Sequence, residues 1–207
     1  MGRPSKIERD EVLNRATRLL WAQGCDAVST RDLEQALDLR APAIYRRFGN
    51  KDGLIAQCME HYIKTVIRVR IKNLLDNADD PLQGLHNFFT SALEPHRRHG
   101  RLHGCLMANT ATQNEGQVPG VHAAIQRGFK LVRKAFKTQI QRAQAIGQID
   151  QNLDPEALSL ALMMSMQGLL TLARANNQDM SLGIDATFHL LKMKTKHNLE
   201  QSQERPL

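Results

Sequence analysis

One stretch of the chain limits its fold more than any other. Residues 29–54, STRDLEQALDLRAPAIYRRFGNKDGL, carry start and stop signals for two very short helices. Ser29 can cap the first helix, and Asp32 three residues later completes the pattern of a capping box. This helix ends near Asp38, a residue type that tolerates turn geometry. Pro42 then fits the first turn of a second helix, where its missing N–H is not needed. Two short helices joined by a tight turn predict a helix-turn-helix motif.

The second short helix is cationic on one side and apolar on the other. Ile44 and Phe48 lie four residues apart and are expected to point inward. Tyr45, Arg46 and Arg47 are then left on the outer side. A helix of this kind can enter the major groove of DNA while its charged residues meet bases and flanking phosphates.

Both short helices need neighbours, because an isolated helix of two turns is marginal in water. Residues 7–23 predict a preceding helix whose apolar residues follow the spacing of one buried face. Another helix opens at Lys51 and repeats apolar residues on one face to about Leu75. We therefore expect the motif to be held between these two longer helices.

The charge distribution agrees with a polyanionic partner. The net charge is +7 and the sequence pI is about 9.6. Residues 1–75 contain 14 Lys and Arg against 9 Asp and Glu, whereas residues 76–207 contain 14 against 12. The excess of +5 in the first part favours nucleic acid as the partner, although a basic surface also serves solubility alone.

Other classes of protein find less support in the sequence. No apolar run reaches the length of a membrane span, and residues 1–20 carry charges throughout, so we expect neither a membrane segment nor a secretory signal. Cys25, Cys58 and Cys105 lie far apart without a CxxC pair, which indicates a reducing cytoplasm and no structural zinc. His96, His99 and His103 near Cys105 match no standard metal site, and we expect no metal or other cofactor.

The region 29–54 resembles the DNA-binding domain of TetR-type transcriptional regulators. The shared elements are Arg-Asp-Leu at 31–33, Leu39, then Ile44-Tyr45, Phe48, Lys51 and Leu54, all in register. The resemblance extends over about residues 6–66. Two positions depart from it: Asp38 stands where the family usually has Gly, and Arg40 where it often has Ser or Thr.

The resemblance implies which residues contact double-stranded DNA. Phosphate contacts are expected from Ser29, Tyr45 and Lys51, with Thr30 beside them. Base edges or nearby phosphates are expected to meet Arg40, Ala41, Pro42, Ala43 and Arg46. Arg3, in an N-terminal arm of residues 1–6, can enter a minor groove, or the arm is a disordered tail. The motif then belongs to a domain of residues 7–66.

The remaining chain also predicts helices, so the fold is expected to be all-α with about nine helices. Residues 67–199 form a ligand-binding and dimerisation domain in this interpretation, and residues 200–207 form a polar tail. A helix capped by Asp154 is apolar on nearly every side, which predicts either burial or a subunit interface. The resemblance implies a homodimer through the last two long helices, bound to a pseudo-palindromic operator.

The C-terminal domain is expected to receive an unknown small-molecule effector. Met107, Met163 and Met166 suit an adaptable apolar pocket, or they are ordinary core residues. Cys105 lies in a Gly-Cys-Leu element that resembles one TetR subgroup, some members of which sense oxidants or electrophiles through this cysteine. A cysteine at a helix start, near Arg98 and Arg101, can be reactive, whereas a buried cysteine is inert.

The leading hypothesis is therefore a sequence-specific DNA-binding regulator. We expect a repressor that leaves its operator on binding a small ligand or on thiol modification. The alternatives are a thiol-dependent enzyme that uses Cys105, and a helical interaction protein without a role on DNA. The enzyme would need a positioned base and an oxyanion site, for which the sequence has no signal.

Overall fold

The computed structural model describes residues 8–94, 103–176 and 180–192, and within these ranges it is built from helices alone. The arm of residues 1–6 with Arg3, most of the connector before Cys105, and the tail of residues 200–207 lie outside the described residues. The elements are α1 (Arg9–Gln23), α2 (Thr30–Leu37), α3 (Ala41–Phe48), α4 (Lys51–Tyr62), η1 (Ile63–Ile67), α5 (Arg68–Ile71), η2 (Lys72–Asp76), α6 (Pro81–Ser91), α8 (Leu106–Ala111), η3 (Asn114–Gln117), α9 (Pro119–Ala145), α10 (Pro155–Asn176) and α11 (Ser181–Lys192).

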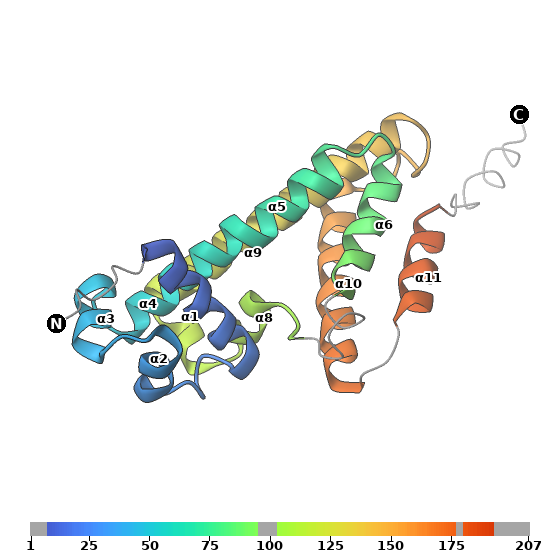
Figure 1. Ribbon diagram of the computed structural model, residues 1–207. Helices are drawn as coiled ribbons and strands as arrows, with labels where there is room; N and C mark the ends of the chain where they lie inside the picture. The colour runs from blue at the N-terminus through green and yellow to red at the C-terminus, as the bar shows by residue number, and fades with distance from the viewer. Residues whose placement is uncertain (1–7, 95–102, 177–179, 193–207) are drawn as a thin grey trace, which may run out of the picture.

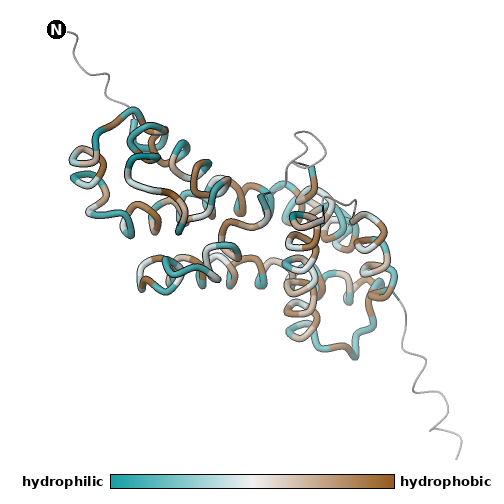
Figure 2. The backbone as a smooth tube through the Cα atoms, turned by 90° about the horizontal axis from the view of Figure 1, so that it is seen from below, coloured by the Kyte–Doolittle hydropathy of each residue, from teal (hydrophilic) through white to brown (hydrophobic). Residues whose placement is uncertain are grey.

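The predicted all-α fold is confirmed. Counting the continuous stretch from α4 to η2 as one helix and leaving the short η3 aside, the described residues contain nine helices. Figure 2 shows hydrophilic and hydrophobic positions alternating along these helices, as amphipathic helices require. The last helix was expected over residues 181–199, and its part beyond Lys192 lies outside the described residues.

Helices α1 to α4 form the N-terminal domain, at one end of the molecule (Figure 1). Val12, Ala16 and Leu20 are buried on the inner face of α1, as their spacing predicts. Ile44 and Phe48 of α3 are buried against the same core. Packing of α3 on α4 and of α1 on α4 holds the two short helices in place.

A long helical rod joins the N-terminal domain to the rest of the chain. Its segments α4, η1, α5 and η2 run from Lys51 to Asp76, and η1 and η2 are π-helical turns. Figure 1 shows α9 lying along this rod. Gly128 permits the approach, since a Cβ there would lie 2.2 Å from Met107 Sδ and 3.0 Å from Ile63 Cδ1. The expected domain boundary near residue 66 falls inside η1, so the two domains share one helix.

The C-terminal end of the molecule consists of α6, α10 and α11 packed beside α9 (Figure 1). Its core is aromatic: the rings of Phe88, Phe89, Phe136 and Phe188 meet at centroid distances of 5.1 to 5.9 Å. His86 Nε2 lies 2.8 Å from Asp185 Oδ1 and links α6 to α11.

Helix α10 leaves much of its apolar surface exposed. The predicted cap is confirmed, because the Asp154 carboxylate accepts the N–H groups of Glu156 and Ala157. By length and composition alone, Pro155–Ala175 could cross a membrane, and within the described residues it is the one helix that passes this test. A core or interface helix of a soluble protein passes it as well. In this chain Glu156 of α10 pairs with Arg133 and Lys137 of α9, so the helix is tied to its neighbour by charges.

Candidate nucleic-acid interface and adjoining cavity

The start of the helix-turn-helix is fixed by the predicted capping box. Ser29 Oγ accepts the Asp32 N–H at 3.2 Å, and Asp32 Oδ2 accepts the Ser29 N–H at 2.9 Å. The Ser29 hydroxyl also donates to the same carboxylate oxygen at 2.6 Å. These bonds hold the pKa of Asp32 below its usual range. Ser29, which was expected to bind phosphate, therefore already uses its hydroxyl within the protein.

The turn between α2 and α3 is made by two acidic residues. Asp38 adopts the left-handed conformation with φ of 53°, so it takes the turn geometry that glycine usually supplies. Glu34 Oε1 accepts the Ala41 N–H at 2.6 Å at the start of α3. Sequence reasoning missed this role of Glu34, because its partner becomes visible only when the turn is folded. The carboxylate fixes the angle at which α3 leaves the turn.

Helix α3 presents its expected outer side to solvent. Arg40, Pro42 and Arg46 are exposed, and Ala41 and Ala43 are partly exposed. The Tyr45 hydroxyl lies 2.8 Å from Thr30 Oγ1, which joins the expected contacts of α2 and α3 into one surface. The structure thus brings most of the expected DNA-contacting residues together on one face, and their individual roles stay predictions.

A cation that the sequence did not single out lies beside this surface. Arg9 of α1 places its guanidinium 5.3 Å from the centre of the Phe48 ring and hydrogen-bonds to Gln57 of α4. The sequence does place an Arg near the start of the first helix, but this residue is far in sequence from α3, so its position beside Phe48 was not expected.

The start of α4 carries Lys51, which the resemblance predicts to bind phosphate, and this role stays a prediction. Asn50 caps the helix by accepting the Gly53 N–H at 2.8 Å. Gly53 is required at this point, since a Cβ would lie 2.1 Å from the Phe48 carbonyl oxygen. Lys51 Nζ donates to Glu115 Oε1 at 3.0 Å, and Glu115 belongs to η3 in the C-terminal domain. Lys51 is therefore engaged within the protein, because folding brings an acidic residue 64 positions away in sequence to its ammonium group.

Residues 103–117 attach to the N-terminal domain at several points. The Trp21 indole N–H donates to the Gly104 carbonyl at 3.0 Å. The Cys25 N–H donates to Gln113 Oε1 at 3.0 Å, and the Cys25 sulfur lies 3.3 Å from Thr110 Oγ1. With the Lys51–Glu115 pair, these contacts make the segment from His103 to Gln117, called the bridging segment below, a physical link between the two domains.

The same bridging segment forms one wall of a cavity of about 170 Å³. The bridging segment contributes His103, Gly104, Cys105 and Met107. The other walls come from α1, the rod, α6, α9 and α10, and their residues are Trp21, Tyr62, Val66, Ile67, Arg70, Phe88, Ser91, Ala92, Val132, Met166, Gln167 and Leu170.

Three of the four residues expected in an effector pocket line this cavity: Cys105, Met107 and Met166. Met163 does not, because it lines a wider basic groove between α9 and α10 with Lys130 and Lys134. Sequence reasoning missed Tyr62 and Arg70. Their spacing with Val66, four residues at each step along one helical face, was the signal that could have found them.

The three cysteines are buried among the described residues, and none is in a disulfide. Burial raises the pKa of the Cys105 thiol, against the smaller opposite effect of backbone N–H groups at the start of α8. Burial also raises the pKa of Cys25, and that of Cys58 to about 12. The helix start therefore does not make Cys105 a thiolate at neutral pH. Among the described residues no cluster of metal-ligating side chains exists, and His103 stands against Trp21 instead.

The fold and the exposed face of α3 define a helix-turn-helix DNA-binding protein. Residues 12–58 match the model of the bacterial regulatory proteins of the tetR family, and residues 81–184 match the tetracyclin repressor-like C-terminal domain. The chain belongs to the TetR family of transcription regulators, as its sequence resemblance implied. It is a regulator that binds double-stranded DNA.

Relatives cover most of the chain at low identity. The HTH-type transcriptional repressor ComR of Escherichia coli is 25% identical over 173 residues, which are 84% of this chain and 82% of ComR. The repressor DhaR of Mycobacterium sp. is 24% identical over 162 residues, which are 78% of this chain and 80% of DhaR.

Solved structures share the fold. A cysteine mutant of the TetR family regulator CifR, solved with 26-base-pair operator DNA, has a TM-score of 0.79 at 23% identity and covers 90% of this chain and 98% of its own. The regulatory protein TetR from Rhodobacter sphaeroides has a TM-score of 0.78 at 24% identity, with coverage of 88% and 97%.

Proposed function

We propose that the protein is a repressor that binds a pseudo-palindromic operator as a homodimer and leaves it when a small molecule enters the cavity. The observation that carries this proposal is the bridging segment. Its first residues line the cavity, and its later residues hold Cys25 and Lys51 of the N-terminal domain. A ligand that shifts this segment changes the spacing of the two recognition helices in the dimer, which alters the fit to two half-sites.

The relatives support the repressor role, since ComR and DhaR are named as transcriptional repressors. The solved CifR complex contains operator DNA, which supports binding of a specific site. The proposed action is binding rather than catalysis, and it takes place in the cytoplasm with the chromosome.

The exposed apolar side chains of α10 and α11 support dimerisation through these helices. On α10, Leu160, Met164 and Leu172 are exposed at multiples of four residues, so they share one face. On α11, Leu182 and Leu190 are exposed to 84% and 66%. A two-fold symmetric pair of these faces would bury them and give one recognition helix per half-site.

Replacing Leu172 by Glu tests the dimer and the operator together. Leu172 is 52% exposed near the end of α10 that adjoins α11, so the charge falls within the proposed interface. Light scattering is expected to give a monomer, and gel shift a large loss of operator affinity. Ile146→Glu is the matched control, because Ile146 is 62% exposed at the end of α9, outside this face. Unchanged dimerisation and DNA binding in Leu172→Glu would refute the interface.

The operator itself is tested by footprinting on DNA fragments selected from the genome with the purified protein. We expect a protected pseudo-palindrome whose half-site centres lie about one helical turn of DNA apart, or a multiple of it. Protection of a single asymmetric half-site would contradict the two-fold arrangement.

A further inference from the structure

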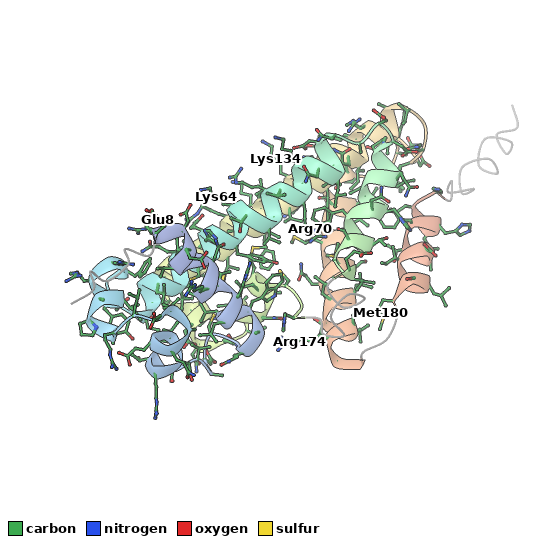
Figure 3. All side chains as sticks on the ribbon, viewed as in Figure 1. Glu8, Lys64, Arg70, Lys134, Arg174 and Met180 are labelled. Carbon is green, nitrogen blue, oxygen red and sulfur yellow. The ribbon has the colours of Figure 1, made fainter. Side chains whose placement is uncertain are left out.

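A cationic side chain in the wall of the cavity indicates the chemical class of the ligand. Arg70 extends from α5 toward α6, and Figure 3 labels it on the inner side of the rod. Its guanidinium lies 4.1 Å from the centre of the Phe88 ring. Nε and Nη2 donate to Ser91 Oγ at 3.3 and 3.0 Å, and Nη2 also donates to the Phe88 carbonyl. These contacts fix the side chain against α6, while Nη1 makes no hydrogen bond to the described residues.

No carboxylate among the described residues pairs with Arg70. The ionisable groups that face it are the Tyr62 phenol and the Cys105 thiol. Burial raises the pKa of both, so they are neutral near pH 7. Burial also lowers the pKa of Arg70, yet a guanidinium keeps its proton in proteins. The cavity therefore contains a positive charge that no acidic group of the described residues neutralises, and such a charge is unfavourable unless an anion accompanies it.

A second polar group in the cavity wall lacks a partner. Gln167 of α10 lines the cavity, and its Oε1 is buried without a hydrogen bond among the described residues. Rotation of the side-chain amide presents either its oxygen or its NH₂ group at this point. Arg70 and Gln167 therefore provide hydrogen-bonding groups from two different helices around one space.

The size and the remaining walls limit what can occupy this space. A cavity of about 150 Å³ in another protein accommodates benzene, and the present volume is about 170 Å³. Val66, Phe88, Val132, Met166 and Leu170 make most of the lining apolar. The lining therefore fits a compact organic molecule with an anionic group at one end.

We propose that the effector is a small monocarboxylate, whose carboxylate pairs with Arg70 and whose short chain or ring packs among the apolar walls. This inference rests on the proposed ligand-controlled function and specifies the ligand class of the same cavity. Arg70 suits a carboxylate because two parallel N–H groups of a guanidinium match its two oxygens. The ligand would also touch Cys105 and Met107, and through them the bridging segment.

Binding can be measured without DNA, because Trp21 lines the cavity and is the single tryptophan of the chain. The wild-type protein is titrated with benzoate, cyclohexanecarboxylate and butanoate, and with the neutral amide of each, while tryptophan fluorescence is followed. At least one carboxylate is expected to give a saturable change and to bind about tenfold more tightly than its amide, or about 1.4 kcal/mol.

Variants assign this preference to one residue. Arg70→Gln is expected to remove the preference for carboxylate over amide, whereas Arg70→Lys keeps part of it. Arg68→Gln, two residues earlier on the same helix and exposed, is the matched control and should behave as wild type. Circular dichroism checks that each variant is folded. If Arg70→Gln does not fold, the comparison of carboxylates with amides on the wild type still tests whether the cavity prefers an anionic ligand.

Gel shift separates this inference from the proposed function. Carboxylates that bind but leave the operator complex intact would support the ligand class and refute ligand-controlled release. Neutral molecules that bind as tightly as carboxylates and release DNA would support release and overturn the ligand class. No fluorescence change with any of the carboxylates up to millimolar concentration would overturn the ligand class as well.

Discussion

The DNA-binding surface and the cavity are assembled in different ways, although one rod connects them. The surface is made by a contiguous stretch, residues 29–51, in which each element is set by a local signal such as a cap, a turn or a proline. The cavity takes its walls from α1, the rod, α6, α9, α10 and the bridging segment, which are distant in sequence. The bounds and turn of the local site are set by nearby residues, although packing on α1 and α4 still holds it in place. The walls of the assembled site, in contrast, come together only through contacts between distant segments.

The largest expected effect tests whether the domain of the DNA-binding surface and the domain of the cavity unfold together or separately. Phe136 is fully buried and packs against the rings of Phe88 and Phe89. Phe136→Ala should lower the free energy of unfolding by about 3–5 kcal/mol. Because α4 and η2 belong to the same rod, we expect both domains to unfold in one transition. Urea unfolding, followed by circular dichroism and by Trp21 fluorescence at fixed protein concentration, measures this.

Phe129→Ala serves as the control, since Phe129 lies on the same helix but is only partly buried. Phe129→Ala should lower the free energy of unfolding by much less than Phe136→Ala. Two separated transitions in Phe136→Ala would show that the N-terminal domain is stable alone and that the rod does not couple the domains.

The next effect concerns the local site. Arg46→Ala or Arg40→Ala should relax discrimination at one base position by about 1–3 kcal/mol if these exposed arginines meet base edges. Tyr45→Ala should instead weaken binding to specific and random DNA alike, because a phosphate contact carries little sequence information. The substitution also removes the hydrogen bond to Thr30. Binding to a library of operator variants at fixed salt measures both.

Tyr45→Phe separates the hydroxyl from the ring, and Arg68→Ala controls for the loss of one charge outside the motif. If Tyr45→Ala changes which sequence is preferred while total affinity stays the same, its assignment to phosphate contact is wrong.

The two sites also differ in how far the sequence predicted them. The fold class, the capping box at Ser29 and the turn at Asp38 follow from local rules, and the structure confirms the fold and both local features. The contact of Glu34 with Ala41 and the pairing of Lys51 with Glu115 depend on folding and were not foreseen. In the cavity, Cys105 and Met107 were expected, whereas Arg70 was not. The role of a charged residue within a largely apolar helical face becomes evident only when the residues that fold around it are known.

Cys105 provides a test of the assembled site by its chemistry. It lines the cavity, whereas Cys25 and Cys58 are fully buried elsewhere in the core. Iodoacetamide should therefore label Cys105 before the other two. Since burial raises its pKa above the ordinary value, the thiolate is the minor form at pH 7, and the labelling rate should keep rising as the pH is raised from 7 to 9. Mass mapping of the folded protein gives the rates.

Gel shift of wild type and Cys105→Ser after treatment with an electrophile decides whether thiol modification has a role in release. Loss of DNA binding in the wild type alone would support it. Equal loss in both proteins, or a fast rate that does not change with pH, would contradict this account of the thiol.

The smallest expected effect lies where the two sites meet. Lys51 and Glu115 are both partly buried, and Glu115 Oε2 has no hydrogen-bond partner among the described residues. An ion pair of this kind contributes about 0.2–1 kcal/mol. Glu115→Gln removes the negative charge that holds Lys51, so the ammonium becomes available to a DNA phosphate. Affinity for DNA should rise by a similar amount at low salt. The slope of log K against log salt should become more negative by up to about one.

Glu60→Gln is the matched control, because it removes the same charge from a pair with Arg127 and leaves Lys51 engaged. In a Lys51→Met background, the substitution Glu115→Gln should have no effect on DNA affinity, since the ammonium group for which Glu115 and a DNA phosphate compete is gone. An equal rise in Glu115→Gln and Glu60→Gln would reduce the effect to net charge. It would also mean that the bridging segment does not act on DNA through Lys51.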